Sequence, residues 1–167
     1  MKKKFIPLGL VLFLLSNLSY SQSRISIGLS GSVQSNQFGI LLPIWLGEKF
    51  VLAPAFDLKF VDKTGTEFSF GLAPRFYFNH EKLAPYFGLK VGTIMNFPSS
   101  DNDIDAKIFD ILAGLAFGAE YFLTDRLSVG VEAQGNFTIS DKDSDRFGNP
   151  GGLNFNTATM VSVTIYF

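Results

Sequence analysis

Val161-Ser162-Val163-Thr164-Ile165-Tyr166-Phe167 are the last residues of this 167-residue chain, and their pattern decides the fold class. Apolar side chains at every second position alternate with small, polar or amphipathic ones. This period of two is typical of a β-strand with one apolar face. The strand also ends on an aromatic residue, so its apolar face extends to Phe167.

The opposite end of the chain has the pattern of an export signal. Three lysines precede an apolar run over 5–15, and the small residues Ser19 and Ser21 predict cleavage after Ser21. We therefore expect residues 1–21 to be a removed signal peptide and residues 22–167 to form one domain. An uncleaved anchor is the alternative, but the run is short for a membrane-spanning helix.

The composition narrows the function classes. Hydrophobic residues make up 47% of the chain, with 19 phenylalanines, and the formal net charge is −1. There is no cysteine, so disulfides, thiol catalysis and a lipidated cysteine are excluded. The charge balance gives no basic face for nucleic acid. After the signal no apolar stretch reaches 18 residues, which excludes a spanning helix.

The period-two pattern recurs through the remainder of the chain. It predicts eight strands, at about 24–33, 37–46, 49–61, 67–78, 83–95, 107–122, 126–138 and 154–167. Each is long enough to cross a bilayer at a tilt. An exported chain with this pattern and this many phenylalanines predicts an all-β, eight-stranded, antiparallel up-and-down transmembrane barrel with its apolar side chains turned out to lipid.

The connections between these strands alternate in length. Short turns at 47–48, 79–82 and 124–125 contrast with long polar loops at 98–106 and 140–153. Bacterial outer-membrane barrels have short periplasmic turns and longer outer loops, so we expect the long loops outside and both termini in the periplasm.

Two strand regions are irregular in this scheme. Around the 62–67 loop, a three-residue hairpin with Gly65 in the left-handed position predicts Phe60 opposite Phe68 and Leu58 opposite Phe70. The same register sets Pro54 opposite Pro74, where we expect a bulge or weak pairing.

The second predicted strand is the other irregular region. Leu41, Pro43 and Trp45 fall on the face of this strand that should be polar. For the outward aromatic residues we expect two girdles at the membrane boundaries. The inner girdle would hold Trp45, Phe50, Phe78, Tyr121 and Phe167, and the outer one Phe38, Phe60, Phe68 and Phe137.

The inward face carries charges. Strand parity predicts an interior charge network of seven residues: Asp57, Lys59, Arg75, Lys90, Asp110, Glu120 and Glu132. An eight-stranded barrel is just wide enough for side chains to fill, and unpaired charges in it would be costly. We expect paired charges that plug the barrel; a narrow polar path is the alternative.

Several segments resemble a known family. The repeats Leu52-Ala53-Pro54-Ala55-Phe56, Leu72-Ala73-Pro74-Arg75-Phe76 and Leu83-Ala84-Pro85-Tyr86-Phe87, with the run from Gly118 to Gly130, resemble the opacity/OmpA-type outer-membrane β-barrel domain in its small eight-stranded form. The resemblance implies insertion by the outer-membrane assembly machinery, with Val161, Val163, Ile165 and Phe167 as the assembly signal. It implies no activity, and the peptidoglycan-binding domain of larger members is expected to be absent.

Candidate chemistry is sparse. His80, the one histidine, falls in a predicted periplasmic turn, away from the outer leaflet where a lipid-modifying enzyme would need its base. Carboxylates alternate in two outer loops that strands six and seven bring side by side, and both sets are weak Ca²⁺ candidates without the full calcium-loop pattern. They are Asp101, Asp103 and Asp105 in one loop and Asp141, Asp143 and Asp145 in the other.

The sequence thus predicts a non-enzymatic integral outer-membrane protein with an envelope-structural or surface-interaction role. Its partners would be outer-membrane lipids, the assembly machinery and an extracellular ligand or partner at the outer loops; no cofactor is expected. The alternatives are a small passive channel for minor solutes and a soluble lipocalin-like binder, in which the apolar faces would point inward.

Overall fold

The computed structural model describes residues 26–35, 37–61, 65–97, 108–144 and 147–167. The predicted signal peptide lies outside these residues. Within the described ranges no helix is long and apolar enough to cross a bilayer. The strands are β1 (Gly28–Gln34), β2 (Gln37–Leu41), β3 (Ile44–Trp45), β4 (Phe50–Val61), β5 (Gly65–Tyr77), β6 (Leu83–Phe97), β7 (Ile108–Thr124), β8 (Leu127–Ile139) and β9 (Leu153–Tyr166).

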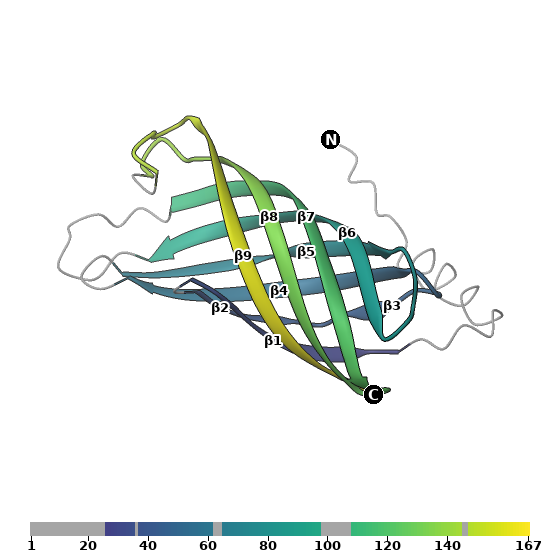
Figure 1. Cartoon of the computed structure of the whole chain (residues 1–167). Helices are drawn as coiled ribbons and strands as arrows, with labels where there is room; N and C mark the ends of the chain where they lie inside the picture. The colour runs from purple at the N-terminus through teal and green to yellow at the C-terminus, as the bar shows by residue number, and fades with distance from the viewer. Residues whose placement is uncertain (1–25, 36, 62–64, 98–107, 145–146) are drawn as a thin grey trace, which may run out of the picture.

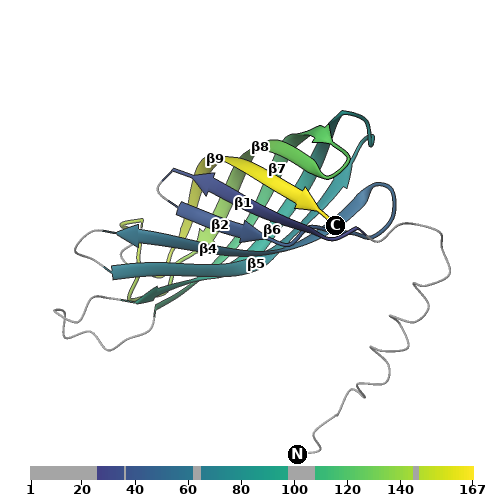
Figure 2. The same cartoon turned by 90° about the horizontal axis from the view of Figure 1, so that it is seen from below.

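The strands form a closed antiparallel barrel (Figures 1 and 2). From β4 to β9 each strand pairs with the next one in sequence, β1 pairs with both β2 and β9, and β2 and β3 both pair with β4. β2 and β3 are two pieces of one broken strand, so the ring has the eight strands that the sequence predicts. Closure leaves no unpaired sheet edge.

The break between β2 and β3 falls at Pro43, which cannot donate a backbone hydrogen bond. The neighbouring backbone groups bond around it: Gly28 N donates to Pro43 O at 2.7 Å, and Trp45 N donates to Ser26 O at 2.9 Å. Leu42 N donates to Pro54 O at 2.9 Å. The irregularity noticed in the sequence is therefore a local break that keeps Leu41 and Trp45 inside the barrel.

The predicted register of the β4–β5 hairpin is wrong by two residues. Phe68 pairs with Leu58, and Phe70 pairs with Phe56. A shift of two residues leaves each side chain on the predicted inner or outer face of the barrel. It changes only which residue lies opposite it on the paired strand.

Two features favour the observed register. Each proline now faces a residue that has an N–H, with Pro54 opposite Leu72 and Pro74 opposite Leu52. Inside the barrel it also sets Lys59 opposite Glu67, and their charged atoms lie 3.3 Å apart. The predicted register would have opposed two prolines and left this pair apart.

Apolar side chains cover the outside of the barrel. Phe56, Phe70, Phe117 and Val163 are 45%, 45%, 61% and 49% exposed, whereas the alternate positions are buried and mainly polar or small. This orientation contradicts the lipocalin-like alternative, which needs an apolar interior.

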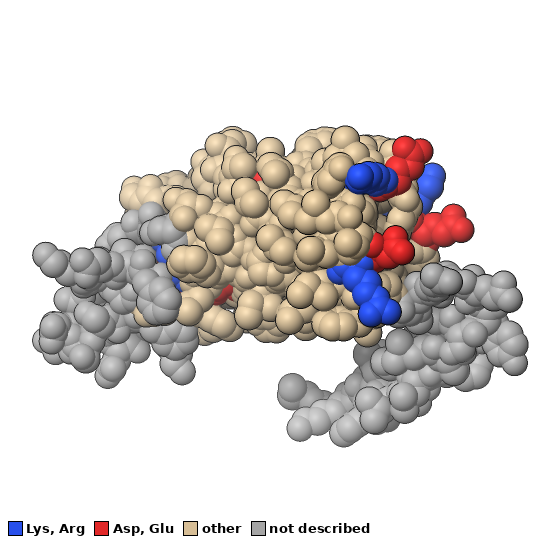
Figure 3. Space-filling view, turned by 60° about the horizontal axis from the view of Figure 1, so that its bottom comes forward, with Lys and Arg blue, Asp and Glu red and all other residues tan. Residues whose placement is uncertain are grey.

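Exposed charges gather at the end of the barrel that carries the short turns, hereafter the turn end (Figure 3). Each of the three turns has an acid followed by a base. The six residues are Glu48 and Lys49, Glu81 and Lys82, and Asp125 and Arg126. The opposite end, with the Ser140–Gly152 connection, is hereafter the loop end.

A close approach of two strands gives a test of the barrel wall. A Cβ at Gly71 would lie 2.3 Å from the carbonyl oxygen of Val91 on the paired strand, so that Gly71→Ala must push β5 and β6 apart. We expect the variant to lose about 1–3 kcal/mol of unfolding free energy, measured by urea titration of the folded barrel. In the control Gly31→Ala the new Cβ meets nothing within 4 Å, so stability should not fall. Equal stabilities of the two variants would contradict this packing.

Candidate functional site in the barrel interior

The centre of the turn end is a buried carboxylate, Glu120 of β7. Tyr77 Oη donates to its Oε2 at 2.5 Å, and Tyr166 Oη donates to its Oε1 at 2.7 Å. Ser128 Oγ also donates to Oε1. The three hydroxyls come from β5, β9 and β8, so one carboxylate ties together strands on different sides of the barrel. Hydroxyl donors take the place that a cation would occupy.

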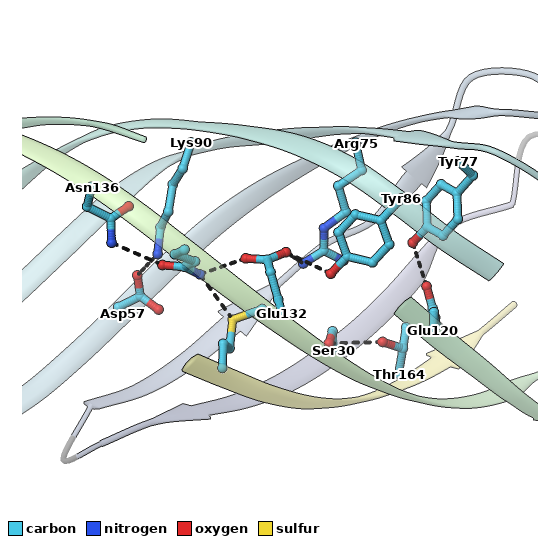
Figure 4. Close-up of polar contacts among 12 residues, drawn as sticks. Ser30, Asp57, Arg75, Tyr77, Tyr86, Lys90, Glu120, Glu132, Asn136 and Thr164 are labelled. Carbon is cyan, nitrogen blue, oxygen red and sulfur yellow. Dashed lines mark hydrogen bonds and ion pairs between the residues drawn. The ribbon is translucent and has the colours of Figure 1, made fainter. Parts of the chain in front are cut away.

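Next to it lies an ion pair between Arg75 of β5 and Glu132 of β8 (Figure 4). Arg75 Nη2 is 3.1 Å from Glu132 Oε2, and both side chains are 5% exposed. Tyr86 Oη donates to the same carboxylate at 2.7 Å, and Gln134 Nε2 donates to it at 2.6 Å. The Arg75 guanidinium also lies 4.8 Å from the centre of the Tyr86 ring. Glu132 thus has three partners, whereas Arg75 has the ion pair and the Tyr86 ring, and its Nε has no hydrogen-bond partner among the described residues.

Aromatic rings close the turn end below these carboxylates. Trp45 lies 4.6 Å from Tyr77 and 6.4 Å from Tyr166 between ring centres. Trp45 is only 3% exposed, so its predicted place in the inner membrane girdle is wrong. Strand parity turns it inward, as its position on the polar face of the predicted strand indicates.

His80 is an exposed residue of the turn end, as expected. Its ring stacks on Phe122 at 5.5 Å and lies 4.5 Å from Trp45. The contacts described for it are therefore aromatic ones. The other predicted girdle members with described side chains are exposed: Phe50, Phe78, Tyr121, Phe167, Phe38 and Phe137 outright and Phe68 in part.

The remaining interior charges lie toward the loop end. Lys59 pairs with Glu67, and Lys90 Nζ lies 3.9 Å from Asp57 Oδ2. Glu67 is not among the predicted inward charges because residues 62–67 are expected to form the connecting loop. The parity of Ser69 and Arg75 would have found it.

Asp110 of β7 holds a loop, and no cation among the described residues pairs with it. Its Oδ1 accepts a hydrogen bond from Asp141 N at 2.8 Å, and its Oδ2 accepts one from Ser144 Oγ at 3.0 Å. Gly151 N donates to Asp141 O at 2.9 Å across the same loop. Asp110 therefore fixes the connection between β8 and β9 to the barrel rim.

The weak Ca²⁺ candidates are only partly described. Asp101, Asp103, Asp105 and Asp145 lie outside the described residues. Asp141 accepts a hydrogen bond from Asp143 N at 3.1 Å, which is a local turn contact. Among the residues that the structure places, no three acidic, histidine or cysteine side chains form a group that could hold a metal.

The ion pair offers a second test. Arg75→Met leaves Glu132 buried without its cation, and Glu132→Gln leaves Arg75 without its anion. Each should lower the unfolding free energy by about 3–5 kcal/mol in urea titrations. The double variant should lose about 1–3 kcal/mol less than the sum of the two, because neither charge is stranded. Glu81→Gln, in an exposed turn, is the control and should be neutral. Strictly additive losses would contradict the pairing.

The barrel resembles two solved structures, although no known protein-family profile and no curated protein matches the sequence. The N-terminal β-barrel domain of Pseudomonas aeruginosa OprF superposes with a TM-score of 0.64 at 14% identity, covering 86% of this chain and 96% of that one. Neisserial surface protein A superposes with a TM-score of 0.56 at 14% identity, covering 85% of this chain and 94% of that one. At this identity the likeness establishes a shared fold: the chain is an eight-stranded β-barrel of the architecture seen in these two proteins.

Proposed function

We propose that this chain is a non-enzymatic integral protein of a bacterial outer membrane, with an envelope-structural or surface-interaction role. The observation that carries the proposal is the outward apolar surface of a closed barrel whose exposed charges gather in the terminal turns. Such a surface is unfavourable in water and favourable in lipid. Of the two barrels with a similar fold, one is the N-terminal β-barrel domain of OprF and the other is named a surface protein, which fits the proposal.

The orientation in the membrane follows the lengths of the connections. The loop end faces the exterior and the turn end faces the periplasm, as is usual for such barrels. The Ser140–Gly152 connection, fixed to the rim by Asp110, is then the part of the described chain that a surface partner would meet first. The chain is exported with residues 1–21 removed.

We also propose that β9 is the segment read by the outer-membrane assembly machinery. Its outward residues Val161, Val163 and Ile165 are about half exposed and form a regular apolar face, which Phe167 continues. The role of the filled interior is then to hold the wall rigid once assembly is complete.

A passive channel is the second candidate, because polar or open space exists near both ends. At the turn end a depression is lined by residues that include Trp45, His80 and Tyr166, and a small cavity with a mixed polar and apolar lining lies toward the loop end. Between them stand the buried Glu120 and Arg75–Glu132 groups with their tyrosines. A solute would have to break these bonds to pass.

Surface labelling tests the proposed orientation. A short epitope inserted after Gly148, an exposed loop position, should be labelled on intact cells. The same epitope inserted after Glu81, in an exposed turn at the opposite end, should be labelled only after the outer membrane is permeabilised. Both proteins should sediment with the outer-membrane fraction. Labelling of the Glu81 insertion on intact cells, or recovery of either protein in the soluble periplasm, contradicts the proposal.

Conductance separates the two candidates. In planar bilayers we expect the native barrel to give no discrete openings, because its buried ion pair and tyrosines fill the cross-section. Regular single-channel steps from the folded native protein would reject the structural role in favour of the channel.

A further inference from the structure

A small cavity lies within the barrel toward the loop end. It has a volume of about 50 Å³, and its lining includes Lys90 of β6, Asp57 of β4, Asn136 and Thr138 of β8, and Asn156 of β9. Figure 4 shows Lys90 and Asp57 directed toward each other with Asn136 nearby, whose Nδ2 donates to Gln134 Oε1 at 3.3 Å. Side chains from four strands thus converge on one space, which holds the Lys90–Asp57 pair of the predicted plug and has no part in the proposed surface role.

Three oxygen atoms around this cavity have no hydrogen-bond partner within the part of the chain that the structure describes. They are Asn136 Oδ1, Thr138 Oγ1 and Asn156 Oδ1. Asn136 is 2% exposed and Thr138 is fully buried. A buried polar atom without a partner costs free energy, so such atoms in a native protein call for an explanation. Asn136 and Asn156 are also direct partners in the β8–β9 pairing, which brings their side chains to the same place.

The two charges in the cavity attract each other without a hydrogen bond. Lys90 Nζ and Asp57 Oδ2 are 3.9 Å apart, beyond hydrogen-bond distance. The ammonium group therefore keeps donors, and the carboxylate keeps acceptors, for a third group between or beside them. The barrel also leaves room for this carboxylate, because a Cβ at Gly39 would lie 2.2 Å from Asp57 Oδ1.

The residues around the cavity indicate which type of molecule would bind there. One positive and one negative group, lying close together, match a molecule that carries both charges. The three unpaired oxygens add acceptors for N–H donors, and Ala55, Ile94 and Leu112 supply a short apolar wall. The volume corresponds to roughly three or four water molecules, at about 15 Å³ for each. Only the smallest amino-acid-like molecules carry both charges and also fit this volume.

We propose that this cavity is a binding site for a small zwitterion of the glycine type. Its carboxylate lies on Lys90 Nζ, and its ammonium group donates to Asp57 and to the side-chain oxygens of Asn136 and Thr138. The ligand enters from the loop end, where Phe147 of the Ser140–Gly152 connection lines the cavity. The site belongs to the folded barrel and does not depend on the membrane in which the protein resides.

The test is a glycine titration of the folded full-length barrel in detergent micelles, followed by the NMR signals of the Asn136 and Asn156 side-chain amides. We expect saturable shifts at both. Acetate carries only the negative charge and methylammonium only the positive one, so each should bind at least about ten-fold more weakly than glycine, since each forgoes one charge-assisted contact.

Two variants locate the site. Thr138→Val keeps the shape and removes the hydroxyl, and should weaken glycine binding about five-fold, which corresponds to one hydrogen bond. Lys90→Met should abolish saturation; if it does not fold, Thr138→Val alone decides. Glu81→Gln, at the turn end, should bind glycine as the native protein does.

Three results would overturn the proposal. The first is an NMR shift of the Asn136 and Asn156 amides that grows linearly with glycine concentration and does not saturate, which means that the cavity holds water alone. The second is methylammonium binding as tight as that of glycine, which means a simple cation site. The third is unchanged glycine binding in the folded Thr138→Val variant, which places the zwitterion elsewhere.

Discussion

Closure of the strand hydrogen-bond ring is the constraint on which the rest of this structure depends. Once β1 pairs with both β2 and β9, each strand must place alternate side chains inside and outside one wall. The outside can then be apolar only if the inside accepts every polar residue. The alternation of apolar and polar residues in Val161–Phe167 is the local result of this constraint, and the other strands of the ring repeat it.

The polar groups of the interior must therefore find hydrogen-bond and charge partners within the barrel. The two halves of the interior differ in how they provide these partners. Toward the turn end, Glu120 receives three hydroxyl donors, and Glu132 receives Arg75, Tyr86 and Gln134. Toward the loop end, Lys90 and Asp57 are loosely paired and several oxygens lack protein partners. The turn-end half is thus hydrogen-bonded around two carboxylates, although Arg75 Nε has no partner among the described residues, and the loop-end half contains the cavity for which we propose a zwitterion.

The sequence predicts which side chains point into or out of the barrel better than it predicts which residues pair across strands. Alternation of residue type placed Phe56 and Phe117 outside and Arg75 and Glu132 inside, because parity is a local property of each strand. The partner of a residue depends instead on register across the barrel, which is not local. The β4–β5 register could not be obtained from the loop alone, since the prolines and the Lys59–Glu67 pair decide it.

The contacts of the interior site illustrate the same limit. Parity could have turned Trp45, Tyr77 and Tyr166 inward, but nothing in the sequence indicates that two of these tyrosines converge on Glu120. Likewise, Asp110 is inward by parity, yet its partners come from a connection thirty or so residues away in the chain, at Asp141 and Ser144. Long-range pairing of this kind becomes visible only when the ring is closed.

Fluorescence quenching by lipids tests the inside–outside arrangement most directly. Trp45 is the only tryptophan and is buried inside the wall. In vesicles of lipids with brominated acyl chains, the native protein should therefore keep most of its fluorescence, whereas the variant with Trp45→Phe and Phe117→Trp should lose most of it. Strong quenching of native Trp45, together with a shielded tryptophan at position 117, would mean that the faces of the barrel are reversed.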